Sequence, residues 1–488
     1  MADFTKDERA TRAYAWRVLS VTSLGSVLSA LNISTLNVAL PVVARHFHAG
    51  GTAASWLLLA YMIVTTVMML SFGRLADIMG RRELYIAGIA CLTITSLACG
   101  LAPSIVWLQV FRVAQAISAA ALITNTTAIL TDAFPRSILP VGLSVQLTLV
   151  ASAQVAGPAL GGLLAQHLGW RAVFWFNVPG GVLGTCWALL TLRRIPRRRT
   201  GERFDVISSA LSLVIIGGLV TALSQGTQYG LVHPLVLVAL AAFVVAVPVF
   251  VRRQRRALHP LLDLSLFDSW PRVSAYVSNL ALAVIRLGVV LLIGLYLQGA
   301  GARSTGATGL IASSVAAGIV ITSPIAGWLV TRFSPQLVCT SGIALQGLAL
   351  TVLAVDLRPS TPAPTLIGLL LAIGVGTGLF MTPNTTSIMT SVPPERRGIA
   401  NAVRSTAQNT GYAVSTALVL GLATFPLSHG ARDLAYQGRL GRLQPSAVSQ
   451  FTSAVHIAFW VLASLALFAG VISYSRGSAR ISAPASVP

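Results

Sequence analysis

The chain has 488 residues, of which 55% are hydrophobic and only 10% are charged, whereas soluble globular chains carry about 25% charged residues. So little charge cannot cover a water-exposed surface, and the composition therefore excludes a soluble enzyme. The formal net charge of +21 would suggest a nucleic-acid partner in a soluble protein. Here the arginines cluster in short segments between apolar runs, which indicates a protein of the lipid bilayer with no nucleic-acid partner.

Fourteen apolar runs are long enough to cross a membrane, because a helix of about 20 residues spans the hydrocarbon core. The runs are continuous and do not alternate at every second residue, which excludes a β-barrel. The sequence therefore predicts an all-α membrane protein with fourteen transmembrane helices. The predicted spans are 17–40, 52–72, 84–102, 105–130, 139–165, 173–192, 207–226, 234–251, 273–298, 307–330, 336–355, 363–390, 399–424 and 453–475.

The 34 Lys and Arg residues are distributed unequally between the two sides of these spans. Basic residues are retained in cytoplasmic segments, so the richer side is expected to be the cytoplasm. This rule predicts a multi-pass protein of the inner (plasma) membrane with both termini in the cytoplasm. The basic residues expected outside are Arg45, Arg171, Arg303, Arg358, Arg432, Arg439 and Arg442, and those within spans are Arg112, Arg286 and Arg404.

An internal repeat suggests how the spans are grouped. Residues 125–131 read NTTAILT at the end of the fourth span, and residues 384–390 read NTTSIMT at the end of the twelfth. Spans 9–14 are therefore expected to repeat spans 1–6, with spans 7 and 8 inserted between arginine-rich segments. The predicted divisions are an N-tail at 1–16, a six-helix bundle at 17–192, a linker with two inserted helices at 193–272, a second six-helix bundle at 273–475 and a C-tail at 476–488.

The segment after the second span, residues 73–82, reads GRLADIMGRR. Its glycines permit a tight turn, and Asp77 can accept hydrogen bonds from a helix N-terminus or pair with an arginine. An ordinary basic loop would explain the arginines but not the Gly-x-x-x-Asp-x-x-Gly spacing. The segment resembles the signature loop of the major facilitator superfamily, where it would form a breakable latch between bundles. The expected gating residues are Gly73, Asp77, Gly80 and Arg81.

Residues 108–115 are similar to another motif of that superfamily, in which an intramembrane arginine precedes a glutamine by three residues. Here these are Arg112 and Gln115. A charge within a span is costly in lipid, so Arg112 is expected to face a cavity. The alternative is that its side chain reaches the outer interface, since Arg112 lies about two turns from the start of its span.

Residues 157–162 read GPALGG and look like the superfamily's antiporter motif. Its small residues allow close helix approach and its proline permits a bend. The motif residues are Gly157, Pro158, Gly161 and Gly162. Residues 169–179, GWRAVFWFNVP, are similar to the hallmark of the fourteen-span drug:proton antiporter family. This resemblance covers essentially the whole chain and implies a major facilitator fold of two six-helix bundles plus two inserted helices.

One position departs from that family. Its members commonly carry an aspartate in the first span as a candidate for proton coupling, and here the position is Asn32. An amide does not titrate, so the family's simplest coupling scheme does not transfer to this chain. None of the 13 acidic residues falls in the middle of a predicted span. The predicted charges within spans are all positive.

Other polar residues within spans are candidates for the cavity. Arg286 lies near the middle of the ninth span, where it either attracts an anion or is neutralised by backbone carbonyls or an unseen partner. Asn125 and Asn384 are related by the repeat and either orient a ligand or bond across helices. Arg404 lies closer to the inner surface and is expected to reach it with its side chain. The predicted cavity residues are Asn32, Arg112, Asn125, Arg286 and Asn384.

The leading functional prediction is a secondary transporter that exports amphipathic small molecules, such as drugs or metabolites, by alternating access with proton antiport. The alternative is a uniporter or exporter of organic anions or neutral metabolites without the usual proton coupling. A membrane-embedded enzyme or a receptor is a distant third class. We expect a monomer with no cofactor beyond an ion or proton gradient. The cysteines lack metal-ligand spacing and are predicted to be small core residues: Cys91, Cys99, Cys186 and Cys339.

Overall fold

The computed structural model describes residues 2–48, 51–193, 205–230, 232–257, 262, 264–299, 305–424, 427 and 445–477. Every regular element in these residues is helical, as expected of an all-α membrane protein. The helices are α1 Ala2–His46, α2 Gly51–Met79, α3 Arg81–Gly100, α4 Ile105–Ala133, α5 Leu139–His167, α6 Ala172–Trp175, α7 Asn177–Thr191, α8 Val206–Tyr229, α9 Pro234–Arg256, η1 Leu264–Phe267, α10 Trp270–Gly299, α11 Thr305–Arg332, α12 Pro335–Asp356, α13 Ala363–Thr390, η2 Pro394–Arg396, α14 Arg397–Thr424 and α16 Pro445–Tyr474.

Each of the fourteen predicted spans falls on a helix, with the sixth divided into α6 and α7. In the described part of the chain, eleven helical segments are long and apolar enough to cross a membrane, and α5 and α8 contain shorter apolar stretches. The remaining predicted span is α14, whose polar side chains include Arg404 and Gln408. The all-helical membrane architecture is therefore confirmed, with a helix count near fourteen.

Several helices, among them α1, α2 and α16, extend beyond the predicted spans. The helix α1 begins at Ala2, ahead of the predicted start at residue 17. The charged residues and alanines of residues 2–16 are compatible with a helix. The helix α2 continues to Met79, so the expectation of a loop over residues 73–79 was wrong. No proline interrupts that segment, and its Leu, Ala, Ile and Met residues favour a helix. The chain turns only at Gly80, whose φ of 102° suits glycine.

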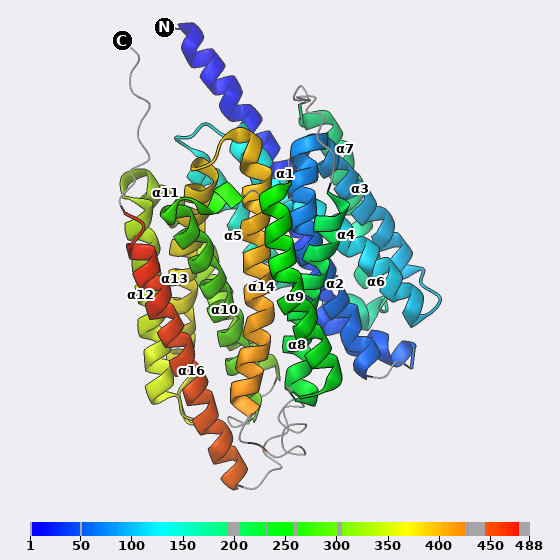
Figure 1. Ribbon diagram of the computed structural model, residues 1–488, viewed down its shortest axis with the longest axis vertical. Helices are drawn as coiled ribbons and strands as arrows, with labels where there is room; N and C mark the ends of the chain where they lie inside the picture. Colours follow the sequence, from blue (N-terminus) through cyan, green and yellow to red (C-terminus); the bar gives the residue numbers. More distant parts are fainter. Residues whose placement is uncertain are drawn as a thin grey trace. The chain divides into compact units, whose positions relative to one another are not determined.

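The helices form two compact units. The first comprises residues 1–219, 241–266 and 388–406, and the second comprises residues 220–240, 267–387 and 407–488. Within the first unit, α1 packs along α5, and α4 packs against both α2 and α3. Within the second, α16 packs along α12 and also contacts α10, and the red and yellow-green ribbons of α16 and α12 lie side by side in Figure 1.

Many large apolar side chains lie on the outer surfaces of the helices. Leu183 and Leu190 on α7 are 66% and 88% exposed, as expected of helices that face lipid. Cys91 and Cys186 are also exposed, so the prediction that all four cysteines are core residues was wrong for these two. A thiol behaves as a small apolar group, so it can lie on a surface that faces lipid without being buried in the protein.

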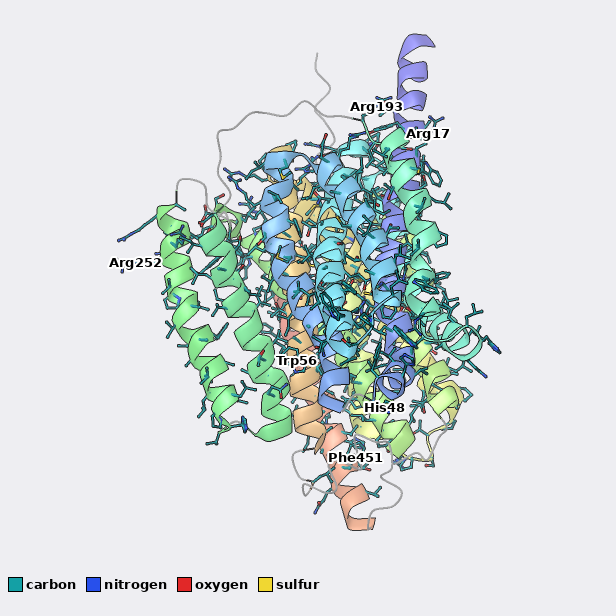
Figure 2. The ribbon with its side chains drawn as sticks, turned by 90° about the vertical axis from the view of Figure 1, so that its right-hand side faces the viewer. Arg17, His48, Trp56, Arg193, Arg252 and Phe451 are labelled. Carbon is teal, nitrogen blue, oxygen red and sulfur yellow. The ribbon has the colours of Figure 1, made fainter. Side chains whose placement is uncertain are left out.

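Arginines of the first unit gather at one of its ends. Figure 2 shows Arg17, Arg193 and Arg252 at this end, while His48 lies towards the opposite end. These arginines belong to the N-terminal segment and to the two arginine-rich segments that the charge rule assigns to the same side.

Candidate functional site

A buried arginine lies between four helices of the first unit. Arg112 of α4 is 1% exposed, and its Nη1 donates hydrogen bonds of 2.6 Å to Oδ1 of Asn32 on α1 and to Oε1 of Gln115. The guanidinium lies over the ring of Tyr61 of α2, 4.1 Å from its centroid, which is a favourable cation–π distance. Arg112 therefore does not reach the outer interface, and neutral groups from α1, α2 and α4 surround its charge.

The hydrogen-bond network around Arg112 continues to α3. Nε2 of Gln115 donates to Oγ of Ser96 at 2.7 Å. None of the ion pairs found among the described side chains involves Arg112, and its Nε has no hydrogen-bond partner. An arginine keeps its charge and offers five N–H donors. The guanidinium of Arg112 can donate to a further acceptor group, and its planar fork suits a carboxylate or phenolate.

Close packing between α1 and α5 positions Asn32. A Cβ at Gly157 would lie 2.6 Å from Cβ of Ser34, and a Cβ at Gly161 would lie 2.6 Å from Cα of Thr35. Both distances are shorter than van der Waals contact, so only glycine permits this approach two and three residues after Asn32. The helix α5 is continuous through the position of Pro158, and Gly162 is half-buried.

In two asparagines related by the repeat, the side-chain Oδ1 receives no hydrogen bond. Nδ2 of Asn125 donates to the carbonyl of Ala121 at 2.7 Å, and Nδ2 of Asn384 donates to the carbonyl of Ala275 at 3.2 Å. Both Oδ1 atoms are buried without a hydrogen-bond partner. A buried acceptor of this kind normally receives a bond from water or a ligand. Asn125 belongs to the first unit and Asn384 to the second.

Arg286 lies on α10 in the second unit and is half-buried. Its guanidinium lies 5.2 Å from the ring centroid of Tyr412, and its Nη1 lies 3.6 Å from Sδ of Met381. These two neighbours are soft and uncharged, and the ring face attracts the guanidinium. The structure thus describes three arginines within the predicted spans: Arg112 in the first unit, Arg286 in the second, and Arg404 on α14.

An ion-pair network joins the end of α4 to the start of α14. Asp132 accepts hydrogen bonds from Arg81 of α3 and, at 2.9 Å, from Nη1 of Arg397. Arg81 also donates to the carbonyl of Pro394, and Nδ2 of Asn401 donates to the carbonyl of Thr124 at 2.7 Å. Sequence reasoning did not assign this role to Asp132, although an acid at the inner end of a span beside Arg81 was the available signal.

Gly73 and Gly80 have separate roles next to this network. Gly73 faces α14, where an added Cβ would lie 3.0 Å from the carbonyl oxygen of Gly398. Gly80 is the N-cap residue of α3 and directs Arg81 towards Asp132. Asp77 lies on α2, but its side chain falls outside the described part of the structure, so its latch role stays a prediction.

Arg404 is 7% exposed and does not extend to the inner surface, which corrects the expectation from sequence. Its Nε donates to Oδ1 of Asn401 at 3.0 Å, and its Nη2 donates to Oγ of Ser405 at 3.2 Å. Local acceptors one and three residues away replace water as partners of the guanidinium, so the side chain can remain among the helices.

Comparison with known proteins places this architecture in a family. The sequence model of the Major Facilitator Superfamily matches residues 22–303 and 273–486. The multidrug resistance protein Stp of Mycobacterium tuberculosis is 33% identical over 404 residues, which cover 82% of this chain and 74% of that protein. The tetracenomycin C resistance and export protein of Streptomyces glaucescens is 27% identical over 450 residues, covering 91% of this chain and 83% of that protein.

The fold of solved structures agrees with this assignment. The human organic anion transporter MFSD10 superposes with a TM-score of 0.62 at 16% identity, covering 94% of this chain and 99% of that structure. The match to the family model and the resistance proteins and transporters among the relatives indicate a multi-pass membrane transporter and not an enzyme. The chain belongs to the Major Facilitator Superfamily and resembles its drug-efflux members.

Proposed function

We propose that this protein exports amphipathic small molecules across the plasma membrane by alternating access, driven by a proton gradient. The observation that carries this proposal is the double ion pair of Asp132 with Arg81 and Arg397. It links α3 and α4, which belong to the first predicted bundle, to α14, which belongs to the second. A link made of charge pairs can break and re-form during each transport cycle.

The relatives support export of foreign or toxic compounds. One is named a multidrug resistance protein and another a resistance and export protein. In an alternating-access cycle, the Asp132 ion pairs would hold the inner ends of α4 and α14 together while substrate leaves on the outside. Their separation would then admit the next substrate from the cytoplasm.

The Arg112 site favours a second candidate for the substrate class. Asn32 stands where the family commonly carries a titratable aspartate, and Arg112 is surrounded by neutral groups. Opposite charges attract strongly in a poorly screened site, so neutral or anionic amphipathic substrates would be preferred over lipophilic cations. In this scheme the usual proton carrier of the first span is absent, and transport is uniport or is coupled through another group.

Transport by the purified protein in proteoliposomes distinguishes these candidates. A matched pair of cationic and anionic dyes would be followed with an imposed pH gradient, with an imposed potential, and with neither. The leading proposal expects accumulation driven by the pH gradient, while uniport expects equilibration that the pH gradient does not change. Absence of transport of either dye under all three conditions, in protein shown to be folded, would count against the export proposal itself.

We also propose a monomer in the inner membrane with both termini in the cytoplasm. Single cysteines introduced into a cysteine-free background at 425–452 should react with an impermeant reagent in sealed cells. Cysteines in 193–206 and 252–272 should react only after lysis. External labelling of either arginine-rich segment would contradict this orientation.

A further inference from the structure

A small cavity opens at the arginine-rich end of the first unit. Its volume is about 160 Å³, and it lies between the beginning of the α1 span, the start of α3, the end of α4 and the end of α7. Ile129 and Leu192 form apolar parts of its wall. The polar lining consists of Tyr14, Arg81, Arg82, Asp132 and Arg193.

The charges of this cavity are predominantly positive. Asp132 is the one acid in the lining, and it already accepts from Arg81 and from Arg397 outside the cavity. Arg82 donates to the carbonyls of Leu192 at 2.6 Å and Leu189 at 3.3 Å, and it forms a long ion pair of 3.8 Å with Glu83. With three arginines and one acid, the lining therefore attracts an anion.

Arg193 is held in place by an aromatic ring. Its guanidinium lies 4.3 Å from the ring centroid of Tyr14, and its backbone N–H donates to the Tyr14 hydroxyl at 3.3 Å. A stacked arginine is oriented without being neutralised, and its edge remains able to donate to phosphate oxygens. Arg82 and Arg193 thus place two positive groups beside the end of α7.

An apolar surface leads from the cavity into the depth of the membrane. On α7, Leu183, Trp187 and Leu190 are 66%, 46% and 88% exposed. They are spaced by four and three residues and therefore share one face of the helix. Three residues after Leu190, Arg193 lines the cavity, whereas Leu192 is buried. A ligand with both a phosphate and a hydrocarbon chain would match the cavity and the α7 face together.

We propose that this cavity binds the phosphodiester headgroup of an anionic membrane lipid, with an acyl chain along α7. Basic pockets between transmembrane helices are suited to such headgroups. A zwitterionic lipid with a headgroup amine would need a free acid, and the acid of the lining is taken by two arginines. A soluble phosphate would use the arginines but leave the α7 face without a role.

Native mass spectrometry of the delipidated full-length protein tests this proposal. The probes are phosphatidylglycerol, phosphatidylcholine with the same acyl chains, and glycerol phosphate, which has the headgroup alone. Phosphatidylglycerol should bind more tightly than phosphatidylcholine, and glycerol phosphate should not displace it. Each basic residue near the membrane surface makes a similar contribution to the attraction of an anionic lipid. Arg193→Gln should therefore weaken phosphatidylglycerol binding about fivefold.

Two further variants control for folding and for non-specific charge effects. Arg193→Lys keeps the charge and should retain most of the phosphatidylglycerol binding. Arg332 lies over Trp328 at the same 4.3 Å distance but does not line the cavity, so Arg332→Gln should bind like the wild type. Three results would each overturn the proposal. They are equal binding of the two lipids, full phosphatidylglycerol binding by folded Arg193→Gln, and displacement of phosphatidylglycerol by glycerol phosphate at concentrations similar to that of the lipid.

Discussion

Oδ1 of Asn32 lies 2.6 Å from Nη1 of Arg112, so a neutral amide occupies the place next to a buried cation. The amide satisfies one donor of the guanidinium without cancelling its charge. An aspartate at the same position would form a buried ion pair and supply a titratable group. The selectivity of transport should therefore depend on this single pair.

Asn32→Asp should weaken transport of an anionic dye and improve transport of a matched cationic dye or its dependence on the pH gradient. The new carboxylate would neutralise Arg112 and repel a substrate anion. We expect the ratio of anion to cation transport to fall about tenfold, equivalent to ~1.4 kcal/mol. Asn32→Ser, which remains polar and neutral, should keep the wild-type preference. An unchanged ratio in Asn32→Asp would show that Asn32 is only a structural hydrogen-bonding residue.

Arg286→Ala should lower the affinity for an anionic dye about tenfold while leaving the protein folded, because loss of a charged hydrogen-bond donor costs ~1.4 kcal/mol. The contacts of Arg286 with Tyr412 and Met381 are weak. Dye binding can be measured by fluorescence anisotropy in detergent. Arg286→Lys should recover part of the affinity. Strong export of the cation with no effect of Arg286→Ala would disprove the anion interpretation.

Asp132→Asn should reduce transport without impairing membrane insertion. The substitution removes the charge that pairs with Arg81 and Arg397, and it should destabilise the joined arrangement of α4 and α14 by about 2 kcal/mol. Initial rates in proteoliposomes containing equal amounts of protein provide the measurement. Asp356→Asn is the matched control, since Asp356 is 69% exposed and pairs with Arg358 at 3.5 Å. Equal rates for both variants would argue against a gating role for Asp132.

Gly161→Ala should lower thermal stability because its Cβ would overlap Thr35 of α1. Overpacking of this kind costs about 1–3 kcal/mol. Scanning fluorimetry in detergent should show a reduced Tm. Gly368→Ala on α13 is a suitable control because nothing lies within 4 Å of its added Cβ, and it should not reduce Tm. Equal melting temperatures of both variants would contradict close packing between α1 and α5.

Asp205 should contribute pH-dependent stability at the start of α8. Burial raises the pKa of its carboxyl, but hydrogen bonds from Arg253 and Ser208 outweigh this effect, and the pKa is lowered overall. The contribution is therefore fully present above the unfolded-state pKa of about 3.9 and is lost as pH falls through the lower folded-state value. Because Arg253 is 39% exposed, we expect about 1 kcal/mol or less.

The measurement for Asp205 compares the melting temperatures of the wild type and Asp205→Asn from pH 7 down to pH 3. The difference should be largest at neutral pH and should shrink as the wild-type carboxyl becomes protonated. A difference that stays constant over this range would show that the carboxylate charge has no part in it.

The sequence by itself determined the class of protein and the positions of its helices. Long apolar runs form helices in a membrane because all backbone hydrogen bonds are then made within the segment, and this property is local. The motif glycines and the departure at Asn32 could also be recognised without coordinates, because each lies in a short stretch of sequence that can be compared with the family's pattern. The end of α2 was missed because a glycine such as Gly73 marks a helix–helix contact as readily as a turn.

Only the tertiary structure decided which charged residues meet. Asn32 and Arg112 are separated by 80 positions, and Asp132 and Arg397 by 265, so no local pattern pairs them. Arg112 could have extended to the membrane surface, but the packing of α1, α2 and α4 encloses it. Asp132 emerged as the acceptor for Arg81 and Arg397 because the end of α4 lies against the start of α14. Side-chain partners depend on helix packing, whereas helix formation depends on the run of residues along the chain.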